Sequence, residues 1–201
     1  MATKRIQMME ETRAKLIAAA RRAFAEKGYS ATSMDDLTAA AGLTRGALYH
    51  NFGDKRGLLA AVVEQMDGEM AAAAMAEAER RGGSPWDRLL AEGRAYIEAA
   101  LTPEVRRIVL LDGPAVLGDP SQWPSQNKCL AATMDGLRAL AAQGTIKPVA
   151  IEAAARLLNG AALNAALWVA ASERPDEVLK GAVAAFEHLA SGLIADEGPA
   201  R

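Results

Sequence analysis

Arg45, Tyr49 and His50 are hydrogen-bonding side chains that fall close together on one short predicted helix. Residues four apart on a helix are neighbours on its surface, and Tyr49 follows Arg45 by four positions. Gly46 and Ala47 keep the start of this helix slim. Glycine costs a helix about 1 kcal/mol relative to alanine, so its presence indicates a close approach to another molecule. A slim helix with donors at its tip fits the major groove of duplex DNA.

The donors divide into two groups by the contact that each is suited to make. Arg45 is predicted to read a base, because its guanidinium can donate two hydrogen bonds to a guanine edge. Contacts to phosphate, which position a protein without reading sequence, are predicted for Thr44, Tyr49, His50 and Lys55. Lys55 also opens the next predicted helix, whose N-terminal amides favour a phosphate.

Two short helices separated by Gly42 must position these side chains. Ser33 and Asp36 form an [ST]-x-x-[DE] capping pair at the start of the first helix. Gly42 ends that helix, because glycine adopts the left-handed conformation without a Cβ clash. The pattern is typical of a helix-turn-helix, in which two helices reverse sharply over one small core.

The second short helix is predicted to begin after Thr44, a good N-cap residue. Leu48 and Phe52 lie four positions apart, so they face inward together. This packing is predicted to turn Arg45, Gly46, Tyr49 and His50 toward the outside.

Apolar residues recur at helical spacing along the rest of the chain, and no alternation typical of strands is found. The further predicted helices run from about Glu10 to Glu26, Lys55 to Arg81, Pro85 onward, Pro103 onward, Ser125 to Gln143, Pro148 to Ser172 and Pro175 to Ala195. The segment from Asp112 to Gln126 is rich in both Pro and Gly and is predicted to be a loop with one helical turn. The predicted fold class is all-α.

The formal net charge of −2 alone does not suggest a nucleic-acid partner. Residues 1–60, however, carry 10 Lys and Arg against 6 Asp and Glu, whereas residues 61–201 carry 13 against 19. The basic part therefore contains the two short helices. With 201 residues and 51% hydrophobic content, the chain is large enough for two lobes with a substantial core.

One cysteine, Cys129, and two histidines, His50 and His188, provide no disulfide, zinc site or catalytic triad. Glycine motifs for phosphate or dinucleotide binding are missing as well. We expect no enzyme activity, no cofactor and no metal. The N-terminus lacks an apolar leader, and the longest apolar stretch, Ala161 to Ala171, is too short to span a membrane. A cytoplasmic protein is expected, with no membrane partner.

Four segments in series carry a resemblance to a known family. They read T-R-A-K-L-I-A-A-A-R-R-A-F-A-E-K-G-Y at 12–29, A-T-S-M-D-D-L at 31–37, A-A-G-L-T-R-G-A-L-Y-H at 40–50 and N-F-G-D-K-R-G-L-L at 51–59. Together they resemble the N-terminal domain of the TetR/AcrR family of transcriptional regulators, with the resemblance covering residues 10–66.

The resemblance implies a three-helix helix-turn-helix DNA-binding domain over residues 1–54, joined to a helical ligand-binding and dimerisation domain over residues 55–201. It implies a repressor that binds a palindromic operator in double-stranded DNA as a homodimer and is released by a small-molecule inducer. The family's DNA contacts, carried over by motif, fall on Ser33, Arg45, Gly46, Ala47, Tyr49, His50, Asn51 and Lys55. Many family members have histidine or tyrosine where this chain has Asn51.

The last two predicted helices, about 148–195, have broad apolar faces that include small residues, and we expect them to pair with a second copy of the chain. Their apolar positions are Ala154, Leu157, Leu158, Ala161, Ala165 and Trp168 on one helix, and Leu179, Ala182, Val183, Phe186, Leu189, Ala190 and Leu193 on the other. The same stripes would also fit a core within one chain.

An uncharged, partly hydrophobic inducer is expected between helices of the C-terminal domain. The candidate lining residues are Trp86, Tyr96, Leu110, Leu111, Trp123, Met134, Asn164 and Trp168. Two alternatives remain open. One is a DNA-binding regulator controlled by a protein partner without a small-molecule pocket, and the other is a helical scaffold that does not bind DNA.

Overall fold

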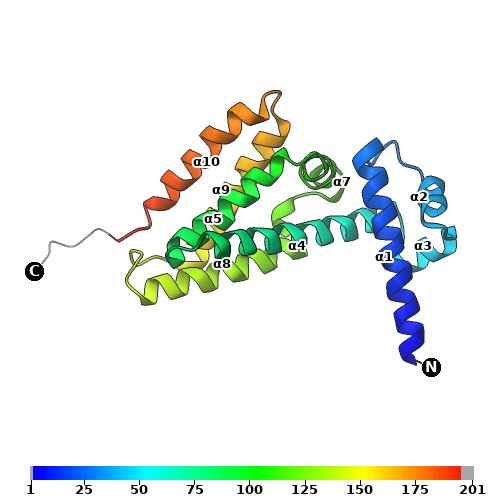
Figure 1. The fold of residues 1–201 in the computed structure, drawn as a ribbon, viewed down its shortest axis with the longest axis horizontal. Helices are drawn as coiled ribbons and strands as arrows, with labels where there is room; N and C mark the ends of the chain where they lie inside the picture. The colour runs from blue at the N-terminus through cyan, green and yellow to red at the C-terminus, as the bar shows by residue number, and fades with distance from the viewer. Residues whose placement is uncertain (1, 196–201) are drawn as a thin grey trace, which may run out of the picture. The chain divides into compact units, whose positions relative to one another are not determined.

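The computed structural model describes residues 2–195, with side chains from Ile6 onward. Within that range the secondary structure is helical, apart from an isolated antiparallel bridge between Ile146 and Ile194. Figure 1 shows the α-helices, which are α1 (Ala2–Lys27), α2 (Met34–Ala41), α3 (Arg45–Phe52), α4 (Lys55–Arg81), α5 (Pro85–Glu98), α6 (Pro103–Val105), α7 (Gly113–Leu117), α8 (Pro124–Ala142), α9 (Ile151–Ala171) and α10 (Pro175–Ser191). The all-α prediction is confirmed.

Three helix boundaries differ from the prediction. α1 begins at Ala2 rather than near Glu10, because residues 2–9 include no glycine or proline that would stop a helix. α9 begins three residues after Pro148, and α10 ends at Ser191 rather than at Ala195. Both differences lie beside the bridge, where Lys147 N donates to Leu193 O at 2.8 Å and Ala195 N to Thr145 O at 3.0 Å. The chain leaves helical geometry there to make these bonds.

The segment predicted as a loop is more ordered than expected. α6 starts at Pro103 as predicted, and the chain continues through a π-helix, η2 (Arg106–Asp112), into α7 and then a 3-10 turn, η3 (Pro120–Gln122). Within the predicted loop, Gly113, Pro120 and Trp123 are buried, which explains its order. The π-helix before it buries Ile108, Val109 and Leu110, and π-helical turns are frequent at functional sites.

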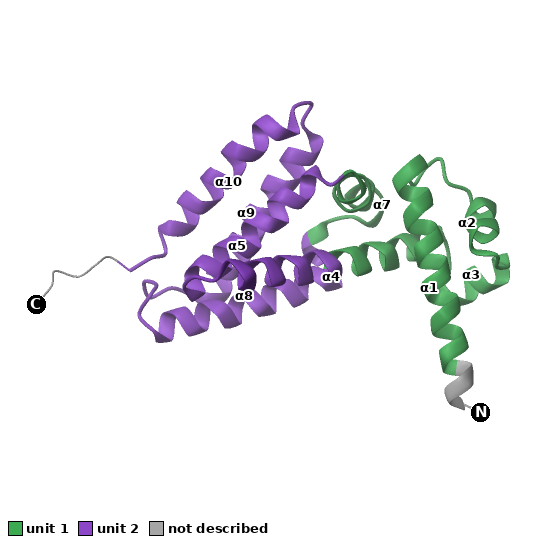
Figure 2. Ribbon diagram, viewed as in Figure 1, with its two compact units in different colours: residues 1–67, 103–120 green, residues 68–102, 121–201 purple. Residues whose placement is uncertain are grey.

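The chain divides into two compact units, coloured in Figure 2. Unit 1 consists of residues 1–67 together with 103–120, and unit 2 of residues 68–102 together with 121–201. Neither unit is a single continuous stretch, so the units do not coincide with the expected division at residue 54. The N-terminal helices share unit 1 with the segment 103–120, a pairing for which the sequence offered no signal.

Unit 1 is held together by a core from α1, α2, α3 and the first half of α4. Apolar residues at helical spacing on α1, Leu16, Ile17, Ala20 and Phe24, are buried. On the apolar stripe of α4, Leu58, Leu59, Val62, Val63 and Met66 are buried, whereas Met70 is half-buried. Leu37 of α2 and Leu48 of α3 have no exposed surface. The apolar spacing in the sequence therefore identified this core correctly.

In unit 2, α9 packs against α5, α8 and α10. Helix α5 begins at Pro85, as predicted, and Ser84 and Asp87 form a capping box at its start. The apolar stripes of α9 and α10 separate into two sets. Buried positions include Ala154, Leu158, Ala182, Phe186 and Ala190, whereas Leu157, Trp168 and Leu189 are 74%, 58% and 71% exposed.

Helices long and apolar enough to cross a membrane are absent from the described residues.

Candidate nucleic-acid interface

The turn between α2 and α3 has the geometry that the sequence predicted. Ser33 Oγ accepts a hydrogen bond from Asp36 N at 3.0 Å, and the Asp36 carboxylate accepts one from Ser33 N at 3.2 Å. Gly42 adopts the left-handed conformation, with φ 64° and ψ 34°. Thr44 Oγ1 then accepts from Ala47 N at 3.2 Å and caps α3. Backbone and capping groups alone therefore fix where the second helix begins.

The outward face of α3 carries the predicted donors. Arg45, Gly46 and His50 are exposed, and Tyr49 is 55% exposed. Leu48 has no exposed surface, and Phe52, the other residue predicted to face inward, is half-buried. The helix therefore presents the predicted residues to solvent and buries its apolar side.

Two other predicted contact residues lie at the edge of this face. Ala47 and Asn51 are half-buried, and Asn51 Nδ2 donates to Ala47 O at 2.8 Å. The Asn51 side chain is thus bound to its own helix. Arg13 of α1 secures the same end, with its guanidinium 4.6 Å from the centroid of the Phe52 ring and Nη1 donating to Asn51 O at 3.4 Å.

Arg45 is paired with Asp35, a residue for which the sequence predicted no role. Its Nε donates to Asp35 Oδ1 at 2.6 Å, and its Nη2 donates to Asp35 Oδ2. This hydrogen bonding holds the pKa of Asp35 below its usual range and raises the pKa of Arg45. The two residues are ten positions apart on either side of a turn, so their contact could not be inferred from spacing.

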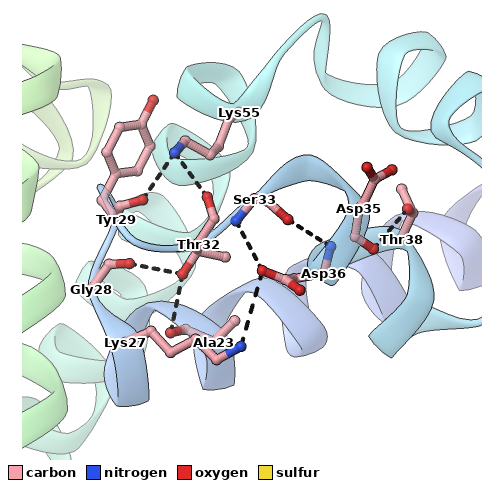
Figure 3. A network of polar contacts seen from close by, with 10 residues as sticks. All are labelled: Ala23, Lys27, Gly28, Tyr29, Thr32, Ser33, Asp35, Asp36, Thr38 and Lys55. Atoms are coloured by element: carbon pink, nitrogen blue, oxygen red, sulfur yellow. Dashed lines mark hydrogen bonds and ion pairs between the residues drawn. The ribbon is translucent and has the colours of Figure 1, made fainter.

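Lys55 lies in a polar network at the junction of α1, α2 and α4, shown in Figure 3. Its Nζ donates to the carbonyl oxygens of Tyr29 and Thr32, each at 2.9 Å, and lies 4.2 Å from the centroid of the Tyr29 ring. Thr32 is buried, and its Oγ1 donates to Gly28 O at 2.7 Å. Two of the three ammonium donors of Lys55 therefore hold the loop that leads into α2.

The segment 103–120 contacts α1 and the loop after it. Arg21 donates to Glu104 through Nε and Nη2, at 2.7 and 2.8 Å. Tyr29 N donates to Asp112 Oδ2 at 2.8 Å, so the residue whose carbonyl binds Lys55 also binds the end of η2. The network around α2 thus extends, through backbone and carboxylate, to a part of the chain far away in sequence.

The candidate ligand residues are divided between the two units. Leu110 and Leu111 belong to unit 1, and the other six to unit 2. Within unit 2, Trp86 and Trp123 are buried, Tyr96 and Met134 are half-buried, and Asn164 and Trp168 are exposed. Trp123 Nε1 is buried without a hydrogen-bond partner among the described residues.

Two family models match the chain. Residues 16–62 match that of the bacterial regulatory proteins of the tetR family, and residues 86–193 match the tetracyclin repressor-like C-terminal domain. The first match covers α2 and α3 with their capping residues, and the second covers more than half of the chain.

Individual relatives agree with the family models. The transcriptional regulator AcrR of Shigella flexneri is 32% identical over 110 residues, which cover 55% of this chain and 51% of AcrR. The chain thus spans about half the length of that relative. A crystal structure of a TetR-family transcriptional regulator from Pectobacterium atrosepticum is 47% identical, with a TM-score of 0.86 over 94% of this chain and 97% of that one.

A more distant structure shares the fold. RolR, solved in complex with resorcinol, has a TM-score of 0.70 at 19% identity over 96% of this chain and all of that one. The outward-facing α3 and its capped turn are consistent with the two family models, which match the N-terminal and C-terminal parts of the chain. This chain belongs to the TetR family of bacterial transcriptional regulators.

Proposed function

We propose that this chain is a repressor that binds a palindromic operator in double-stranded DNA. The observation that carries the proposal is the outward face of α3, where Arg45, Gly46, Tyr49 and His50 are exposed above a fully buried Leu48. A helix of this kind fits a major groove, with Arg45 contacting a base. Thr44, Tyr49, His50 and Lys55 contact phosphates.

The operator is bound by a homodimer in which two α3 helices lie about one DNA turn apart, roughly 34–36 Å. The exposed residues Leu157, Trp168 and Leu189 form what we call the α9–α10 face. Leu157 and Trp168 lie eleven residues apart, three helical turns, so they share one side of α9. An apolar face of this kind is covered when the same helices of a second copy pack against it as a four-helix bundle.

Release from the operator follows binding of a small molecule in unit 2. The buried Trp123 Nε1–H, which has no acceptor among the described residues, supports this step, because an unsatisfied buried donor costs free energy that a bound acceptor would recover. Trp86, Tyr96 and Met134 add apolar and polar surface in the same unit. An uncharged ligand with an acceptor group fits these residues.

The DNA step is tested with sequences selected from random duplexes by the full-length chain. We expect a palindrome containing guanine and an affinity that falls steeply as salt rises, because each neutralised phosphate contributes about −0.9 to the slope of log K against log salt. Arg45→Ala is expected to reduce the preference for that guanine by roughly 5- to 150-fold. Failure of the unaltered chain to select any sequence would favour the scaffold alternative.

Lys55 is expected to contribute to both folding and DNA binding. Lys55→Met removes the hydrogen bonds to the Tyr29 and Thr32 carbonyls and should lower the free energy of unfolding by about 1.5 kcal/mol, measured by denaturant titration. It should also weaken all duplexes equally and reduce the salt slope by about 1. Lys27→Met, which removes an exposed lysine 4.0 Å from Asp36, is the control and should leave stability nearly unchanged. An unfolding curve for Lys55→Met that matches the control would contradict the structural role.

The α9–α10 face is tested by placing a charge in it. Leu189→Glu should convert the dimer to a monomer in analytical ultracentrifugation and weaken operator binding, because an unpaired carboxylate would have to be buried in the interface. Met75→Glu, at an exposed methionine of α4, should leave the dimer intact. Equal dimer stability in both variants would place the interface elsewhere.

The ligand step is tested by thermal unfolding with a panel of uncharged aromatic compounds that includes resorcinol. A compound that binds the folded chain raises the melting temperature. Trp123→Phe removes the indole N–H and should reduce that shift, whereas Met75→Leu, at an exposed position of α4, should preserve it. If no small molecule shifts either protein but a copurifying protein releases the operator, control by a protein partner is the better account.

A further inference from the structure

Asp35 places a carboxylate beside the arginine that we propose reads a base. It is the second residue of α2, and Arg45 is the first residue of α3. The two carboxylate oxygens accept from Nε and Nη2 of Arg45, the first at 2.6 Å. The pair is therefore a bidentate fork contact that crosses the turn between the two helices.

Folding explains this carboxylate only in part: as an acidic residue in the first turn of α2, Asp35 favours the dipole of that helix. The neighbouring Asp36 completes the capping box with Ser33, and Figure 3 shows the Asp35 carboxylate directed away from those contacts. The side chains of Arg45 and Asp35 are 61% and 68% exposed, so solvent screens the pair, although its bidentate geometry makes it stronger than most surface ion pairs. A negative charge on this face would also repel phosphates, so its presence next to Arg45 calls for a role in recognition.

The geometry of the contact leaves a specific edge of Arg45 available. A guanidinium has five N–H donors, and Asp35 uses that of Nε and one of Nη2. Three donors remain, and of these one on Nη2 and one on Nη1 lie side by side at the end of the guanidinium, next to the edge that Asp35 occupies. Guanine offers two acceptors, O6 and N7, that such an edge can contact at the same time.

We propose that Asp35 is a specificity-determining residue that holds Arg45 in the orientation that contacts guanine. This inference rests on the proposed DNA-binding function. Arginine has many rotamers, and restricting them before binding lowers the entropy that the contact must overcome. Asp35 positions the arginine, and Arg45 makes the base contact.

The test uses the full-length chain and the duplex selected by the unaltered protein. The preference is measured as the ratio of affinities for that duplex and for one in which the guanine lost by Arg45→Ala is replaced by adenine. Asp35→Asn is expected to reduce this ratio at least fivefold, because a neutral amide cannot accept both N–H groups. Its affinity for unrelated duplex DNA should be unchanged or higher, since a negative charge has been removed.

Two further variants separate geometry from charge. Asp35→Glu keeps the charge but moves the carboxylate by one methylene, and it should also reduce the ratio. Glu26→Gln removes an exposed carboxylate from α1 and should leave the ratio unchanged. In the Arg45→Ala background, Asp35→Asn should have no further effect on the ratio.

An Asp35→Asn protein that binds every duplex more tightly with an unaltered ratio would show that Asp35 only repels phosphate, and would overturn the inference. If Asp35→Asn lowers the affinity ratio further in the Arg45→Ala background, the inference is also overturned, because Asp35 would then act independently of Arg45. If the unaltered chain selects no duplex at all, the proposed function itself fails, and that result is distinct from the other two.

Discussion

The burial of Leu48 against the core of unit 1 is the constraint on which the rest of the interface depends. A helix of eight residues has little stability of its own, so its orientation comes from the side that it buries. With Leu48 inside, the positions of Arg45, Tyr49 and His50 follow from helical geometry. The capped turn at Gly42 adds the direction of the helix, and Arg13 over Phe52 secures its far end.

In this part of unit 1, basic side chains are bound to specific acceptor groups of the protein. Arg45 is matched to Asp35, and Lys55 donates to two carbonyl oxygens while the backbone of Tyr29 binds Asp112. Groups that could meet phosphate are therefore also parts of the protein's own structure. A change at Lys55 alters both roles at once, and binding data on it are meaningful only beside unfolding data.

The sequence predicted what depends on local rules. The capping box at Ser33, the left-handed Gly42 and the buried faces of α1 and α4 follow from spacing and residue type, and the structure confirms them. Contacts between residues distant in sequence could not be predicted. Asp35 meets Arg45 only across a turn, and Asp112 at the end of η2 meets Tyr29 only after α2 to α6 intervene. The apolar positions of α9 and α10 also did not reveal which of their residues are exposed. Small residues allow a helix to pack closely on more than one side.

Unit 1 is assembled from two separate stretches, so the chain crosses between units after Asp67, after Thr102 and after Pro120. A fragment that ends at Asp67 would lose Glu104 and Asp112, the partners of Arg21 and Tyr29. A chimera that carries unit 1 on another protein should therefore include both stretches, because a single splice point would leave residues 103–120 behind.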